Sequence, residues 1–508
     1  MAATGGDGPR RLVVVAIAVV VALLVGLVVA VGGPDPAGDD AVLPTADRSD
    51  DADDQVDAEP PAADAPDDPA PVPDDGLTGL GDPYFPDTGN SGYDVSHYDL
   101  DLTWHPDEQR VDGVATVTAT ATTDLDAFSL DAVGLDVASV TVDDDAASAE
   151  PVGERDLLVT PADPLAAGDE FTTVVTYRAA PQQLTGVDFI SAGWVADGDE
   201  VYVAFEPNGA ATLFPVNDHP SDKASYTFRV TVPEGLEVAA NGLLREQVPG
   251  DGGTTWVYDA PDLMASYLVQ LVIADLEFVE STGPDGLPVR LAIDSDVGGV
   301  AQGPLGRTAE IIDAYDDLFG PYPFVSVGGV VVDEPLGYAL ETQTMPIYGT
   351  DSAMDESVIA HELAHQWFGD MVSPATWQDI WLNEGFATYA ELLWREHTGQ
   401  GGPEEFAAGY ANGSSLLALP PADPGASDLF APSVYDRGAL ALYVLDRTVG
   451  REVFLAILRT WVQRHDGSSA STADFEAVAE EVSGAELTPM FDAWLRAPSM
   501  PPLSDWVT

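Results

Sequence analysis

The pattern of apolar and polar residues divides the chain into four stretches. Residues 12–31 form an unbroken run of Leu, Val, Ile, Ala and Gly without a charge. Residues 32–83 are rich in Pro, Asp, Ala and Gly and contain no aromatic residue. From residue 84 apolar and polar residues alternate in short runs, which is typical of strands. After about residue 300 the apolar residues recur with a helical period.

The alternating runs predict an all-β domain over residues 84–290, and the helical period predicts a mostly helical domain over residues 291–508. The expected strands cover residues 98–104, 111–122, 171–177, 226–232 and 256–258. The expected helices cover residues 303–319, 356–369, 380–397, 433–449, 452–464 and 472–482. A short apolar run at residues 326–332 predicts one buried strand in the helical domain.

Residues 12–31 are long enough to cross a membrane. A helix of this length spans about 30 Å, the thickness of the hydrocarbon core. Arg10 and Arg11 precede the run, so the positive-inside rule predicts a cytoplasmic tail at residues 1–11 and places everything after residue 31 outside the cytoplasm, with the chain anchored in the cell membrane. A cleaved signal peptide, which would leave a secreted protein, is the alternative. Its apolar region is usually shorter, about 7–15 residues, so an uncleaved anchor is favoured.

Composition predicts a linker and excludes several classes of function. Residues 32–83 cannot bury enough apolar surface to fold, which predicts an extended acidic linker. The formal net charge is −69, and a charge so negative repels phosphate and excludes nucleic acid as a partner. The chain has no cysteine, which excludes disulfides and thiolate chemistry. Two alternative explanations of the acidity stay open, codon bias in a GC-rich genome and a surface suited to high salt.

The pattern His361-Glu362-Leu363-Ala364-His365 lies within the helix expected over residues 356–369. Two histidines four positions apart share one helix face, so both imidazoles can reach one metal ion. Glu362 projects at an adjacent angle, close enough to contact a metal-bound water without being a ligand. In a chain with only seven histidines this spacing rarely arises by chance, and it predicts a site for one Zn²⁺ per chain.

A catalytic zinc needs a third protein ligand and an open position for water. Glu384, in Trp381-Leu382-Asn383-Glu384-Gly385 on the next expected helix, is the expected third ligand. Glu391 follows two turns later on the same helix. It could accept a hydrogen bond from a ligand histidine and fix its tautomer, and an ordinary solvated glutamate is an equal alternative.

The zinc motif and its surroundings resemble the M1 family of zinc metallopeptidases, the gluzincin aminopeptidases related to aminopeptidase N and leukotriene A4 hydrolase. The resemblance runs from about residue 93 to residue 501 and includes the segments at 92–98, 214–220, 264–268 and 319–324. It implies an N-terminal saddle-like β domain and a thermolysin-like catalytic domain. The chain ends soon after Trp494, so we expect a short form without the C-terminal helical domain of longer members.

The resemblance also implies roles for three more residues. Glu206 and Glu341 match the acidic residues that hold the free α-ammonium group of a peptide substrate, and Tyr435 matches the tyrosine that stabilises the oxyanion. The motif around Glu341 departs from the family pattern at Tyr338, Leu340 and Thr342, which stand where Gly, Met and Asn are usual. Recognition of the amine is expected to survive because the glutamate is present.

The sequence therefore predicts a membrane-tethered zinc aminopeptidase that acts on peptides with a free N-terminus. Zinc is expected to lower the pKa of its bound water toward about 7, and Glu362 to act as general base and then as general acid. One alternative is an endopeptidase, against which Glu206 and Glu341 argue because an internal peptide bond offers them no cation. The other is an inactive envelope-tethered binding protein, against which the complete set of catalytic residues argues.

Overall fold

The computed structural model describes residues 79–187, 190–300, 302–411 and 413–507, which belong to the same structural unit. The expected anchor at residues 12–31 and most of the expected linker lie outside the described residues. Within the described ranges, none of the helices is long and apolar enough to span a bilayer.

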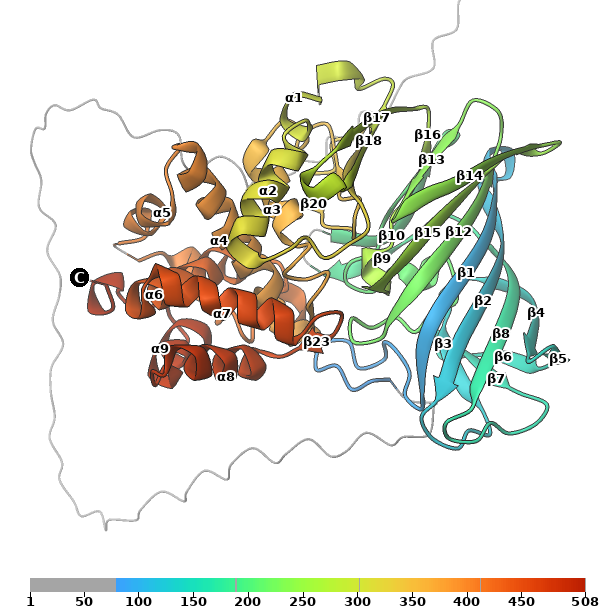
Figure 1. Cartoon of the computed structure of the whole chain (residues 1–508). Coiled ribbons are helices and arrows are strands. Elements are labelled where there is room, and N and C mark those ends of the chain that lie inside the picture. The colour runs from blue at the N-terminus through green and yellow to red at the C-terminus, as the bar shows by residue number, and fades with distance from the viewer. Residues whose placement is uncertain (1–78, 188–189, 301, 412, 508) are drawn as a thin grey trace, which may run out of the picture. The chain divides into compact units, whose positions relative to one another are not determined.

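In the described part of the chain, the first half forms three sheets (Figure 1). The orders of their strands are β14-β15-β12-β1-β2-β8-β4-β5, β13-β16-β11-β10-β9 and β3-β7-β6. The bounds are β1 (Tyr93–His105), β2 (Arg110–Ala121), β3 (Phe128–Asp131), β4 (Asp136–Val142), β5 (Asp145–Ala146), β6 (Ser148–Val152), β7 (Asp156–Thr160), β8 (Glu170–Ala179), β9 (Gln182–Val187), β10 (Ile190–Asp197), β11 (Glu200–Ala204), β12 (Lys223–Val232), β13 (Glu237–Ala240), β14 (Leu243–Gly250), β15 (Gly253–Ala265) and β16 (Leu271–Ala274).

The five expected strands are present as β15, β12, β1, β2 and β8, which lie next to one another in the large sheet. The other strands of that sheet, β14, β4 and β5, lie outside them. The alternation of the five expected strands is the cause: in β2 nearly every second side chain is buried, and the ones between face outward. The prediction of an all-β first domain is therefore confirmed. The strands of the smaller sheets are short, and the periodicity did not indicate them.

A further sheet joins the two halves. In the described residues its order is β17-β18-β19-β21-β20, with β17 (Leu276–Thr282), β18 (Pro288–Asp294), β19 (Val327–Val331), β20 (Ala339–Leu340) and β21 (Ile347–Tyr348). The expected strand at 326–332 is β19. The expected domain boundary at 290 and 291 falls inside β18, which pairs in parallel with β19. The last strands before that boundary therefore belong to the sheet of the catalytic half.

The second half is mostly helical, as predicted (Figure 1). Its helices are α1 (Gln302–Leu305), α2 (Thr308–Phe319), α3 (Glu356–Ala364), α4 (Trp381–Thr398), α5 (Pro403–Gly409), α6 (Gly438–Val449), α7 (Arg451–Arg464), α8 (Thr472–Ser483) and α9 (Thr488–Phe491), with a small pair of strands, β22 (Ser373–Pro374) and β23 (Ser469–Ala470). A π-helical turn at Ser433–Arg437 leads into α6.

Two helix predictions need correction. The helix expected over residues 303–319 is broken between α1 and α2, where Gly306, a poor helix former, precedes Arg307. The helix expected over residues 356–369 ends at Ala364. After it the chain turns at Gly369, whose φ of +127° favours glycine, and Phe368 forms a bridge with Val372.

The residues just before β1 also belong to the folded unit. Asp82, assigned by composition to the linker, is buried, and its carboxylate accepts hydrogen bonds from the backbone N–H groups of Tyr84, Phe85 and Trp377. The hydroxyl of Tyr84 donates a hydrogen bond to the carboxylate of Asp423. The linker prediction therefore extends too far at its C-terminal end, because composition does not distinguish a capped, buried Asp from solvated ones.

Candidate active site

Two packed helices carry the three expected zinc ligands. Asp355 caps α3 by accepting a hydrogen bond from the backbone N–H of Ser357, and the helix presents His361 near its end. His365 is the first residue after α3. Glu384 lies in the first turn of α4, which packs against α3. The helix ends thus bring together ligands that are separated by a long stretch of sequence.

The distances between the donor atoms suit one metal ion. Glu384 Oε2 lies 3.1 Å from His361 Nε2 and 3.5 Å from His365 Nε2. The ligand atoms of these three residues all lie within 4.8 Å of one another. Nitrogen and oxygen ligands about 2.0–2.2 Å from zinc at tetrahedral angles lie about 3.4 Å apart, so the donor set and its spacing fit zinc.

The structure also fixes which nitrogen of His365 is available. Its Nδ1 lies 3.0 Å from the carbonyl oxygen of Phe368, in the turn that follows α3. A carbonyl can only accept, so Nδ1 carries the hydrogen and Nε2 keeps the lone pair on the side of Glu384. This hydrogen bond depends on the early end of α3. If the helix continued, the Phe368 carbonyl would instead accept a hydrogen bond from a backbone N–H of the next turn.

Burial and neighbouring charges shift the pKa values of the ligands. Burial would raise the pKa of Glu384, but His365 and His361 outweigh it and lower the pKa to about 2. Burial lowers the pKa of His361. For His365 burial acts in the same direction, but the carboxylates of Glu341 and Glu384 outweigh it and raise the pKa well above its ordinary value. An ionised Glu384 is the form that a metal requires.

Glu206 and Glu341 lie beside this cluster. Oxygen atoms of Glu206, Glu341 and Glu384 lie within 4.8 Å of one another, as do ligand atoms of Glu341, Glu362 and His365. Both Glu206 and Glu341 are buried, and one oxygen of each has no hydrogen-bond partner among the described residues. Burial raises the pKa of both, and the charge of Glu341 raises that of Glu206 further. Such a pair favours a bound cation.

Glu362 and Tyr435 complete the expected set. Glu362 is buried, and burial raises its pKa well above the ordinary value. The ring of Tyr435 stacks against that of His361 at 6.0 Å between centroids. Burial, followed by the charge of Glu384 and the other carboxylates, raises the pKa of Tyr435, so its hydroxyl keeps its proton and can donate.

A contact between two glycines joins the elements that carry Glu384 and Tyr435. Gly385 of α4 and Gly438 of α6 pack directly against each other. A Cβ added at either position would lie 3.0 Å from the backbone Cα of the other. This approach is possible only because neither residue has a side chain.

Glu391 lies apart from the other predicted residues. Its side chain forms a hydrogen bond with Ser357, one turn before His361 on α3, and the positive charge of Arg395 acts on it. Burial raises its pKa to about 7. The described contacts therefore connect Glu391 with the start of α3, whereas the hypothesis of a direct hydrogen bond to a ligand histidine finds no support in them.

Sequence reasoning missed three residues that hold the site in place. Lys223, the only lysine of the chain, donates hydrogen bonds to the carbonyls of Asp370 and Met371 in the turn after α3, and burial lowers its pKa to about 7. Gln366 donates to the Glu341 carbonyl and to Asp370. A single lysine among acids was a feature that could have drawn attention to Lys223.

Arg437 is the third of these residues. It is fully buried two residues after Tyr435, and its guanidinium donates to backbone carbonyls on two other segments of the chain. The acceptors are Leu417, Ala418, Leu419, Ala493, Trp494 and Ala497. Burial lowers its pKa to about 10, and these carbonyls satisfy its donors. Arg437 thereby fixes the π-helical turn that carries Tyr435.

Comparison with known proteins agrees with this geometry. The sequence matches the model of the peptidase M1 N-terminal domain over residues 95–268 and that of the peptidase family M1 domain over residues 305–494. Aminopeptidase M1 of Arabidopsis thaliana is 29% identical over 334 residues, which are 59% of this chain and 37% of that protein. Glutamyl aminopeptidase of Bos taurus is 26% identical over 350 residues. The chain thus spans about a third of the length of these relatives.

Solved structures match over a larger share. The M1 zinc metallopeptidase from Deinococcus radiodurans is 34% identical, with a TM-score of 0.79, and the match covers 84% of this chain and 98% of that one. A mutant of that enzyme has been crystallised with the substrate Tyr-Ser-Ala. Native yeast LTA4 hydrolase shares the fold at 21% identity, with a TM-score of 0.67, over 81% of this chain and 69% of that one. On the two domain matches, the shared fold and the zinc-binding geometry, this chain belongs to peptidase family M1.

Proposed function

We propose that this protein is a zinc-dependent aminopeptidase that removes the N-terminal residue of peptides. The observation that carries the proposal is the pair Glu206 and Glu341, two buried carboxylates with unpartnered oxygens beside the three metal ligands. A peptide N-terminus supplies the cation that such a pair favours, and charge-assisted hydrogen bonds to it are strong. The tripeptide bound by the Deinococcus enzyme supports a peptide substrate.

The residues of the chain divide the work of hydrolysis. His361, His365 and Glu384 would hold the zinc ion, which when bound would act as a Lewis acid that polarises a carbonyl and acidifies water. Glu362 accepts a proton from the attacking water and delivers it to the leaving nitrogen.

Tyr435 and the pair of acids act on the substrate. The Tyr435 hydroxyl donates a hydrogen bond to the carbonyl oxygen as negative charge develops there. Glu206 and Glu341 bind the α-ammonium group, which orients the first peptide bond toward Glu362. Aminopeptidase activity follows from this orientation, because an internal peptide bond has no ammonium group to offer.

A panel of free and N-acetylated aminoacyl and peptide substrates, with and without a chelator, tests this function. Acetylation removes the cation, and the loss of one or two charge-assisted hydrogen bonds should lower kcat/KM by about 10- to 10⁴-fold. Chelation should abolish both activities. Equal rates with blocked and free substrates, or cleavage at internal bonds, would instead favour an endopeptidase.

We propose further that residues 12–31 anchor the protein in the cell membrane, with the catalytic domain outside the cytoplasm. The length of the apolar run and the preceding Arg10 and Arg11 support this topology. Protease treatment of intact cells should digest the catalytic domain, and N-terminal sequencing of the mature chain should find residues 12–31 retained. A mature N-terminus near Gly33 would indicate a cleaved signal peptide.

A further inference from the structure

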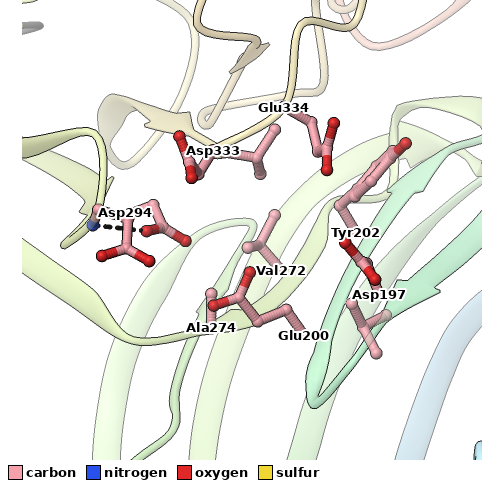
Figure 2. A pocket seen from close by; sticks show the side chains of 11 residues that line it. Asp197, Glu200, Tyr202, Val272, Ala274, Asp294, Asp333 and Glu334 are labelled. Carbon is pink, nitrogen blue, oxygen red and sulfur yellow. Dashed lines mark hydrogen bonds between the residues drawn. The ribbon is translucent and has the colours of Figure 1, made fainter. Parts of the chain in front are cut away.

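A cavity lies where strand ends of the β domain meet strand ends of the catalytic domain (Figure 2). Its volume is about 200 Å³. Val272, Ala274 and Val332 line its apolar side and belong to a small core between the two sheets. The charged residues that line it, which we call the boundary pocket, are Asp197, Glu200, Asp294, Asp296, Asp333 and Glu334.

All the charges of the boundary pocket have the same sign. Among the described residues, no lysine, arginine or histidine lines the cavity. Burial, followed by the charges of Asp294, Asp296, Asp333 and Asp197, raises the pKa of Glu200 to about 7. Carboxylates that face one another in this way destabilise the fold unless a cation or protons neutralise them.

Asp294 gives independent evidence for a ligand. Its side chain is only 2% exposed. One carboxylate oxygen accepts a hydrogen bond of 2.9 Å from the backbone N–H of Asp296, and the other has no partner among the described residues. Figure 2 shows the side chains of Asp294, Asp333 and Glu200 pointing toward one another around the cavity. A buried carboxylate oxygen without a donor is costly, so this oxygen indicates a missing partner.

The chemistry of the lining and the room in the cavity indicate the class of the partner. Carboxylates alone are ligands for hard cations. In the described chain, three ligand atoms come within 4.8 Å of one another only around His365 and Glu384, so the boundary pocket does not form a closed shell for a dehydrated ion. The cavity has room for several water molecules as well as an ion. Mg²⁺ dehydrates reluctantly and usually keeps several of its waters beside one or two protein carboxylates.

We propose that the boundary pocket binds a divalent metal cation that keeps part of its water shell. The ion joins strand ends of the two domains, with Glu200 on one side and Asp294 and Asp333 on the other. β11 ends at Ala204, two residues before Glu206, and β20 ends directly before Glu341. The bound ion therefore stabilises the segments that lead into both ammonium-binding glutamates.

Thermal unfolding of the zinc-loaded, full-length chain tests this site. Millimolar Mg²⁺, compared with NaCl at the same ionic strength, should raise Tm by about 2–4 °C. The substitutions Asp294→Asn and Glu200→Gln should each remove this rise. In metal-free buffer, Asp294→Asn should itself raise Tm, because it relieves repulsion. Titration calorimetry should find one Mg²⁺ site in the wild type and none in either variant.

The matched controls are Asp145→Asn and Glu150→Gln, which remove exposed acids from β5 and β6. Both should keep the full response to Mg²⁺. An equal rise in every variant would mean non-specific screening and overturn the proposal, as would no rise in the wild type. A larger rise with spermidine than with Mg²⁺, lost in Asp294→Asn, would overturn the metal assignment in favour of an organic ammonium ion. If Asp294→Asn does not fold, Glu200→Gln decides between these results.

Discussion

The active site and the boundary pocket both contain several carboxylates, but they differ in the other possible metal ligands near these acids. In the active site, His361 and His365 lie among four buried glutamates. The ligand atoms of His361, His365 and Glu384 lie close enough to share one ion. The boundary pocket has carboxylates but no histidine, and among the described residues no three of its ligand atoms lie within 4.8 Å of one another. If the boundary pocket holds the hydrated ion that we propose, donor type and spacing, rather than the number of acids, separate it from a site for a bare zinc ion.

Removal of a zinc ligand should have the largest effect. In His365→Ala one of three ligands is missing, so the zinc content should fall from about one ion per chain to well below that, with loss of nearly all turnover. Metal analysis and peptide hydrolysis measure the two effects. His397→Ala, which removes an exposed histidine at the end of α4, is the control and should keep both. Retention of tightly bound zinc by His365→Ala would remove this residue from the ligand set.

Replacement of the general base should separate metal binding from proton transfer. Glu362→Gln preserves shape but cannot accept a proton, so kcat should fall by about 10² to 10⁴ while the zinc content stays near one per chain. Single-turnover kinetics and metal analysis on the same preparation measure both. Rates near those of the wild type would exclude Glu362 from proton transfer.

A pair of substitutions should distinguish the two acidic regions directly. Glu341→Ala should lower kcat/KM for a free-amine substrate by about 10- to 100-fold and change little for an N-acetylated one, because it removes one charge-assisted hydrogen bond. Asp333→Asn, in the boundary pocket, should leave the preference for a free amine intact. The aminopeptidase assignment fails if Glu341→Ala affects both substrates equally.

The smallest effect concerns the pH dependence of stability in the boundary pocket. Burial and the charges of Asp294, Asp296, Asp333 and Asp197 raise the pKa of Glu200 to about 7 in the folded chain. Between about pH 4.5 and 7 the folded state therefore binds more protons than the unfolded state. Protonation of Glu200 removes the repulsion at low pH, and this stabilisation of the folded state is lost as the pH rises. In metal-free buffer, Tm of the wild type should therefore fall relative to Glu200→Gln over this range. A constant difference would mean that Glu200 titrates normally.

Local patterns made much of this structure predictable. The alternation in β2 specifies that strand because one of its faces is buried, whereas the first ten residues of α4 are all buried and its apolar run, rather than one apolar face, marks the helix. The spacing of His361 and His365 predicts a shared metal, because the helix geometry holds for both residues. Glu206, Glu341 and Tyr435 were predicted only through the family resemblance, and the structure brings all three to the same site.

The remaining features depend on contacts that no local pattern encodes. The early end of α3 is tied to the hydrogen bond between His365 and the Phe368 carbonyl. The burial of Asp82 depends on a backbone N–H group nearly three hundred positions later in the chain. The boundary pocket combines strand ends that are far apart in sequence, so its acids were indistinguishable from the general acidity of the chain.

The contact between Gly385 and Gly438 has a consequence for how this site can change. Glu384 directly precedes one glycine, and Tyr435 lies three residues before the other. A methyl group at either position would lie 3.0 Å from the Cα of the other glycine, so the two segments would have to shift by a few tenths of an ångström. Two residues without a side chain therefore set how closely the segments that carry Glu384 and Tyr435 approach each other. A single substitution at either one would change that approach without altering any of the predicted catalytic groups.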